Sequence, residues 1–125
     1  MSLFEHNAVT WFEIPTADFE RATKFYEAVL DIEFKSSPGE DSCNIFPAGG
    51  GVAGCLIYRP GSKPSPDGAR VFLNVDGKLD ASIRRAQRLG ATITVPRTYV
   101  PGGKSVYACF LDSEGNHVGL HSRCF

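Results

Sequence analysis

Two histidines near the C-terminus, His117 and His121, have a residue type and spacing that suggest chemistry. They stand four positions apart in the stretch DSEGNHVGLHS, with Gly119 midway between them. In an extended strand, residues two positions apart share one face, so these three residues are predicted to point the same way. Imidazoles bind transition metals and also transfer protons near neutral pH. The pattern predicts either half of a metal site or a strand whose metal ligand has been replaced.

Glu13 is the second candidate, because it stands between Phe12 and Ile14 in the otherwise apolar stretch AVTWFEIP. Burying a carboxylate without a partner is costly, so this side chain should face a polar cavity or pair with a cation. By the same strand period, Glu13 shares a face with Trp11. Whether it also meets a histidine depends on the fold.

The elements that must position these residues occur twice in the chain. A β-branched and aromatic strand over 8–15 precedes a helix over 19–30, for which Asp18 is the expected N-cap or first-turn acid. A strand over 70–76 then precedes a helix over 78–90, which ends at Gly90. Further short strands, bounded by turns, are predicted at 32–37, 43–48, 52–59, 91–97, 105–112 and 116–122.

Each half of the chain therefore has the order βαβββ, and the fold class is α+β. The whole chain, 1–125, is interpreted as one domain, with module one at 8–58, a Pro/Gly/Ser-rich linker at 59–69 and module two at 70–122. When the two helices are aligned by their ends, Trp11 falls over Arg70 without a gap. An internal repeat of this length indicates a duplicated architecture.

The overall composition excludes several classes of function. Residues are 42% hydrophobic and 22% charged, and the net charge of −1 leaves no basic patch for nucleic acid or a membrane surface. The chain contains no apolar stretch near the length of a membrane span. Its 4 cysteines form no C-x-x-C pair and are interpreted as reduced thiols, so we expect a cytoplasmic protein.

The chain resembles the vicinal oxygen chelate superfamily, which includes glyoxalase I, extradiol dioxygenases and bleomycin-resistance proteins. The resemblance covers nearly the whole chain, and its most specific pieces are WFEIPTADFERATKFYEAVLDIEF and ACFLDSEGNHVGLHS. It implies that each module curls into a half-barrel and that the paired half-barrels enclose one small-molecule cavity. It also implies a homodimer, in which the cavity is sometimes completed across the interface.

The resemblance also locates the metal ligands of metal-dependent members, one on the first and one on the last strand of each module. In this chain the four positions hold Trp11, Arg70, Cys55 and Gly119. Only Cys55 carries a donor group, and Arg70 would repel a cation. We therefore expect no metal cofactor.

A displaced divalent-metal site is kept as the less favoured alternative. Its donors would be Glu13, His121 and a third group such as His117 or Cys55. An iron-dependent dioxygenase is disfavoured, because the usual positions lack the two histidines and one carboxylate of its facial triad.

In the family's fold, Glu13 and His121 lie on the cavity-facing side of neighbouring strands. A carboxylate and an imidazole facing one pocket are what a general base and its orienting partner need, so these are the predicted catalytic residues. Purely structural roles are the alternative. For the histidine that role is a hydrogen-bonded position on the sheet, and for the carboxylate it is an ion pair with Arg70.

Trp11 and Arg70, in place of two metal ligands, favour direct binding of an organic molecule, by stacking and by a guanidinium fork. Cys55 is a further candidate ligand-binding residue, because it stands at one of the four ligand positions. Tyr99 and Lys104 are also candidates, because they belong to a loop that is either a hairpin connection or a flap over the cavity. The sequence thus predicts a protein that binds a small polar or anionic organic molecule without the family's metal. The alternative is a lyase or isomerase that uses the predicted catalytic pair.

Overall fold

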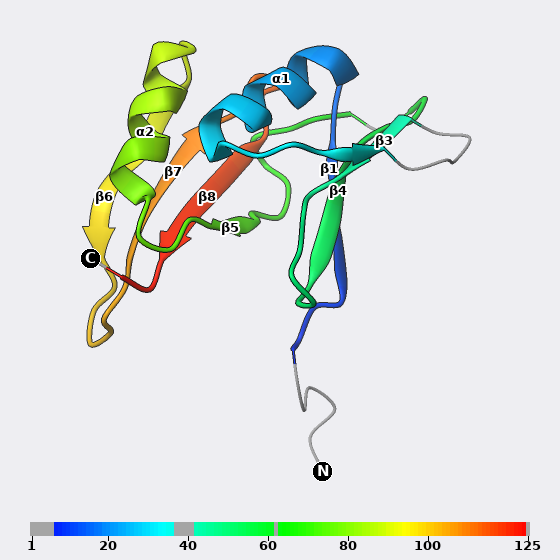
Figure 1. Ribbon diagram of the computed structural model, residues 1–125. Coiled ribbons are helices and arrows are strands. Elements are labelled where there is room, and N and C mark those ends of the chain that lie inside the picture. Colours follow the sequence, from blue (N-terminus) through cyan, green and yellow to red (C-terminus); the bar gives the residue numbers. More distant parts are fainter. Residues whose placement is uncertain (1–6, 37–41, 62, 125) are drawn as a thin grey trace.

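The computed structural model describes residues 7–36, 42–61 and 63–124, and Figure 1 shows its two modules. The first module consists of β1 (Trp11–Pro15), α1 (Phe19–Leu30), β2 (Lys35–Ser36), β3 (Ser42–Ile45) and β4 (Ala53–Tyr58). The second consists of β5 (Phe72–Asn74), α2 (Leu79–Arg88), β6 (Thr92–Tyr99), β7 (Val106–Leu111) and β8 (His117–Ser122). The predicted βαβββ order is confirmed in both halves.

Each module forms its own mixed sheet of four strands. The strand orders are β1-β4-β3-β2 and β5-β8-β7-β6, so the two sheets have the same topology. The first strand of each module runs parallel to the last, and the other neighbours are antiparallel. This arrangement confirms the α+β class and the paired modules.

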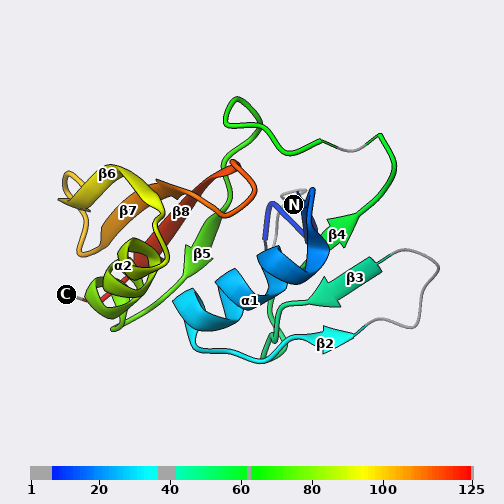
Figure 2. The same ribbon diagram turned by 90° about the horizontal axis from the view of Figure 1, so that it is seen from above.

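The two helices contact each other on one side of the molecule, and the sheets diverge beneath them (Figures 1 and 2). In the described part of the chain, β1 pairs only with β4, and β5 pairs only with β8. The sheets of one chain are therefore joined through helices and loops rather than by strand pairing.

Helix α1 forms where the sequence predicts it. The side chain of Asp18 accepts a hydrogen bond from the backbone N–H of Arg21 at 3.0 Å, which is the expected N-cap contact. The buried residues recur at helical spacing and form the core under the helix: Ala22, Phe25, Tyr26 and Val29. The helix ends at Asp31, which adopts a left-handed conformation with φ of 55°.

Polar contacts from the turn between β7 and β8 hold the two modules together. The buried side chain of Glu114 accepts hydrogen bonds from the backbone N–H groups of Ala17 and Asp18, at 2.9 and 2.7 Å. It also forms an ion pair with Arg21, at 2.8 Å. A carboxylate of module two thus binds the N-terminal end of the module-one helix, where its charge is favourable.

Several strands are shorter than predicted, because tertiary pairing limits them. The predicted strand over 32–37 pairs only at Lys35–Ser36, where β2 contacts β3, and residue 37 lies outside the described part. The predicted strand over 70–76 is reduced to Phe72–Asn74. Within the described residues, no helix is long and apolar enough to cross a membrane.

Candidate functional site

Each sheet has one face packed on the helices and one face turned away from them, which we call the open face. On the first sheet, the strand period and register place Trp11, Glu13, Cys43 and Cys55 on the open face. On the second sheet, the corresponding residues are Phe72, Tyr107, Cys109, His117, Gly119 and His121. Most of the predicted site residues lie on these two faces.

On the first open face, Glu13 is bound to a cation, as its position in an apolar strand predicts. Arg59 donates to both carboxylate oxygens of Glu13, at 2.9 and 3.5 Å. The indole Nε1 of Trp11 donates to the same carboxylate at 3.4 Å. The ion-pair partner in the structure is therefore Arg59, and not Arg70 as the structural alternative supposed.

Cys55 lies on the same face and is fully buried. Burial, together with a hydrogen bond to the thiol of Cys43, raises the pKa of Cys55 to about 12. This thiol is therefore protonated at neutral pH. It contacts a second thiol on the neighbouring strand, a pairing that the sequence did not reveal.

On the second open face, Arg70 lies beside a cluster of aromatic and sulfur groups. Its guanidinium donates to the Sγ atom of Cys109 at 3.3 Å and lies 5.9 Å from the centre of the Phe72 ring. The ring of Phe72 in turn packs edge-on against Tyr107, with centroids 5.9 Å apart. Among the described residues, no carboxylate forms an ion pair with Arg70, so most of its donors remain available to an anion.

The two histidines of β8 have different surroundings. The Nε2 atom of His117 is 2.6 Å from the hydroxyl oxygen of Thr94 on β6, which lies on the far side of β7 in the sheet. His121 is half-buried and lies between Asn74 of β5 and Tyr107 of β7 in the strand register. The hydrogen bond of His117 fits a structural role, whereas His121 lies beside the ring of an aromatic cluster.

The structure places the remaining two predicted ligand-binding residues elsewhere. Tyr99 pairs with the buried Val106, so it lies on the helix-facing side of the sheet and not beside Arg70. Its ring contacts Arg97, which forms an ion pair with Asp80 of α2 at 3.3 Å. Lys104 is exposed in the turn between β6 and β7. That connection is a hairpin, which was one of the two predicted forms.

A single chain does not bring the predicted catalytic residues together. Glu13 belongs to the first sheet and His121 to the second, and β1 and β8 are not neighbours. Glu13 and His121 could line one cavity, as predicted, only if the two modules were placed differently from the way they are placed within this chain.

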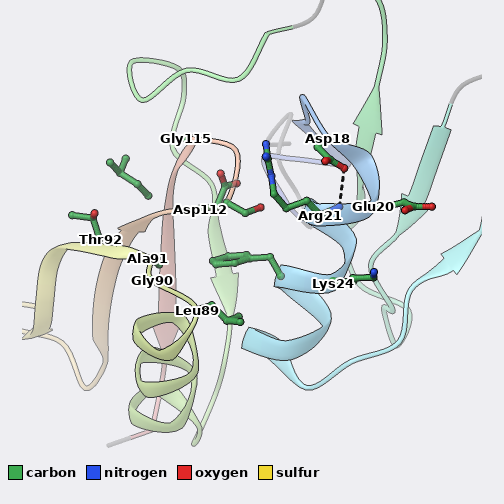
Figure 3. Close-up of a pocket in the computed structure, with 13 residues that line it drawn as sticks. Asp18, Glu20, Arg21, Lys24, Leu89, Gly90, Ala91, Thr92, Asp112 and Gly115 are labelled. Atoms are coloured by element: carbon green, nitrogen blue, oxygen red, sulfur yellow. Dashed lines mark hydrogen bonds between the residues drawn. The ribbon is translucent and has the colours of Figure 1, made fainter.

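The hollow drawn in Figure 3 lies apart from both open faces. It has a volume of about 780 Å³ and is lined by the first turns of α1, the loop after α2 and the turn after β7. Asp18 and Arg21 lie along one wall, and Gly90 and Thr92 along the other. None of the predicted site residues lines it. Two of its lining residues, Asp18 and Arg21, form the helix cap, and Arg21 also binds Glu114, so the hollow belongs to the junction between modules.

The residues at the family's metal positions do not fit a divalent cation. The Trp11 indole is a hydrogen-bond donor only and Arg70 is a cation, so Cys55 is the one residue at these four positions that carries a metal donor. A Cβ atom at Gly119 would overlap the ring of Phe72, which occupies the space of the fourth ligand. The described residues also contain no cluster of three or more His, Cys, Asp or Glu side chains arranged for a metal.

Four residues on or beside the open faces were not predicted from the sequence: Cys43, Arg59, Phe72 and Tyr107. Arg59 could have been found, because it continues the two-residue period from Cys55 beyond the end of β4. The position of Cys43 depends on the pairing of β3 with β4, which no local pattern specifies.

The paired βαβββ modules, each with an open sheet face, define the class of fold to which this protein belongs. The family model described as "Glyoxalase/Bleomycin resistance protein/Dioxygenase superfamily" matches residues 8–120. This chain belongs to that superfamily. Among curated proteins, none is similar enough in sequence to count as a match.

Several solved structures share the fold. A glyoxalase/bleomycin resistance protein from Albidiferax ferrireducens T118 has a TM-score of 0.75 and 19% identity, covering 91% of this chain and 98% of its own. A hypothetical protein, SA1046 from S. aureus, has a TM-score of 0.71 and 19% identity, with coverages of 94% and 95%. The fosfomycin resistance protein FosX from Listeria monocytogenes has a TM-score of 0.68 and 17% identity, with coverages of 91% and 89%. At these identities the similarity establishes the fold alone.

Proposed function

We propose that this protein binds a small anionic organic molecule between its open sheet faces, without the superfamily's usual divalent metal. The observation that carries this proposal is Arg70, whose guanidinium lies on an open face beside an aromatic ring. A planar guanidinium binds carboxylate or phosphate with two parallel hydrogen bonds, and the neighbouring rings supply an apolar wall. The free thiols of all four cysteines support a reducing compartment such as the cytoplasm.

Glu13 is better suited to shaping the pocket than to removing a proton. Its carboxylate already accepts from Arg59 and from Trp11, so a substrate proton would have to compete with both donors. These contacts also fix the Trp11 ring over the first open face, where it can stack on a ligand. Lyase or isomerase chemistry would require Glu13 to leave Arg59, so we favour binding over catalysis.

The role of Arg70 can be tested with the one tryptophan in the chain, Trp11, as the reporter. We expect some members of a panel of benzoate, phenylphosphonate and inorganic phosphate to change its fluorescence in a saturable manner. Arg70→Ala should weaken that binding by about 10- to 100-fold, because a charge-assisted hydrogen-bonded pair is lost. Arg88→Ala removes the same charge from the exposed last turn of α2 and serves as the matched control. Equal affinities for Arg70→Ala and the unaltered protein would contradict the proposal.

We propose further that the pocket is shared between two copies of the chain. Large apolar side chains remain exposed on both open faces, with Trp11 43% and Phe72 47% accessible. Membership of the superfamily, which matches over residues 8–120, makes a homodimer the expected assembly. A second copy that placed its second open face against the first would bury both rings and bring Glu13 near His121 of the other copy.

A mixing experiment distinguishes a shared pocket from one within a single chain. Trp11→Phe removes the reporter, and Arg70→Ala removes the anion-binding group. If the pocket is shared, mixing the two variants should restore the fluorescence response, because one pocket of the mixed dimer has both residues. Sedimentation equilibrium checks that the mixed dimer forms. A mixed dimer without any recovered response would show that each pocket lies within one chain.

A further inference from the structure

We propose that Cys43 and Cys55 form a two-coordinate site for a monovalent soft metal ion, with Cu(I) as its natural probe. The site lies between β3 and β4 on the first open face. It uses only one of the superfamily's four ligand positions, and its second donor comes from a strand that supplies none of them. It is also separate from the anion-binding group proposed above, since Arg70 lies on the other sheet.

The strand register brings the two thiols together. In the antiparallel pairing of β3 with β4, Cys43 stands opposite Ile57, and Cys55 stands opposite Ile45. The cysteines are therefore diagonal neighbours on one face, within reach of each other's side chains. The Cys43 thiol also contributes to the raised pKa of Cys55, as expected for two side chains on one face that approach each other.

The spacing suits a bridging ion better than a direct sulfur–sulfur bond. Diagonal neighbours across antiparallel strands have Cα atoms about 7–8 Å apart, whereas a disulfide needs about 4.4–6.8 Å. Two metal–thiolate bonds of about 2.3 Å each span the extra distance. Both cysteines are free in the structure, so their sulfurs remain available.

The surroundings favour an ion that needs few donors. The described residues offer no third His, Cys, Asp or Glu arranged with the pair, so a tetrahedral site for zinc is incomplete. Thiolates select Cu(I) among soft ions. Cu(I) with two thiolates carries one negative charge. The Glu13–Arg59 ion pair faces the site, and both of its charges act on Cys55: the carboxylate raises the pKa of the thiol, and the guanidinium lowers it. Cys43 is only half-buried and provides access from solvent.

Binding requires both thiols to release their protons to solvent as the two sulfur–copper bonds form. No electrons are transferred, because the copper stays in the monovalent state throughout. Because two protons leave for each ion bound, the affinity should rise as the pH rises.

The test is an anaerobic titration of the full-length protein with Cu(I) against a chromogenic Cu(I) chelator, at several pH values. We expect one Cu(I) per chain, and loss of this binding in both Cys43→Ser and Cys55→Ala. Cys109→Ala is the matched control, because Cys109 is also fully buried on an open face but contacts Arg70 in place of a second thiol. Circular dichroism checks the fold of each variant. Cys43→Ser should disturb the fold less than Cys55→Ala, because Cys43 is only half-buried whereas Cys55 is buried.

Three results would overturn the site. The first is an unaltered protein that takes no Cu(I) from the chelator. The second is a folded Cys43→Ser protein that binds as tightly as the unaltered one. The third is loss of binding in Cys109→Ala, which would place the ion on the other sheet. Cys43→Ser should leave anion binding, measured through Trp11 fluorescence, unchanged, since that residue is outside the proposed anion site. The two proposals are therefore tested separately.

Discussion

Replacing Glu114 with alanine is expected to lower the free energy of unfolding by about 3 kcal/mol. Two backbone N–H groups, those of Ala17 and Asp18, lose their charged acceptor at the start of α1. The ion pair with Arg21 adds little beyond this, because 54% of that side chain is exposed. Chemical denaturation at pH 7 measures the loss. Glu20→Ala, an exposed acid in the first turn of the same helix, should change stability by no more than about 0.5 kcal/mol.

The contribution of Glu114 should disappear in acid. Burial alone would raise the pKa of Glu114, but hydrogen bonds from Arg21, Asp18, Ser113 and Ala17 outweigh it and lower the pKa below its ordinary value. A carboxyl group with a lowered folded-state pKa stabilises the protein above its unfolded pKa, about 4.3 for glutamate. The stabilisation is lost as the pH falls through the folded-state value. Stability curves of the unaltered and Glu114→Ala proteins should therefore converge below about pH 4, and a constant gap down to pH 2 would contradict this account.

The sequence predicted the elements better than the contacts between them. The apolar spacing of α1 and the cap at Asp18 are local signals, and both were found correctly. The helix predicted over 78–90 ends slightly earlier, at Arg88 with Leu89 as its C-cap, and Gly90 follows with a φ of 84°, which favours a residue without a Cβ atom. Each of these signals lies within a few residues of the element that it defines.

For the site, the two-residue period of a strand could predict which side chains share a face, but not which side chains meet across strands. That period placed Trp11 with Glu13 on one face, and the structure agrees. The cation that binds Glu13 is Arg59, 46 positions away in the sequence, and this pairing depends on the register between β1 and β4. The Cys43–Cys55 contact likewise depends on register. Glu114 gave no signal at all, because a carboxylate in a turn is ordinary and its partners lie in the other module.

The second contact between the modules should fail at the opposite end of the pH scale. The fully buried hydroxyl of Tyr26 donates to Asp112 at 2.6 Å, and this bond joins α1 to the end of β7. Tyr26→Phe should cost about 1–3 kcal/mol at pH 7, because Asp112 loses a short charge-assisted hydrogen bond. Asn116 still donates to the same carboxylate oxygen, at 3.2 Å, which keeps the loss moderate. Tyr58→Phe, at an exposed position, is the matched control and should be nearly neutral.

Burial, with the nearby charge of Asp112 and its hydrogen bond, raises the pKa of Tyr26 well above its ordinary value. A phenol with a raised folded-state pKa contributes its full stability below the unfolded pKa, about 10 for tyrosine. The contribution declines as the pH rises above that value, because the unfolded chain ionises first. The unaltered protein should therefore lose its advantage over Tyr26→Phe between about pH 10 and 12. Stability curves that stay parallel over this range would show that the hydroxyl is not held by Asp112. Convergence in alkali for Tyr26, and in acid for Glu114, would identify two separate polar contacts that fix one module against the other.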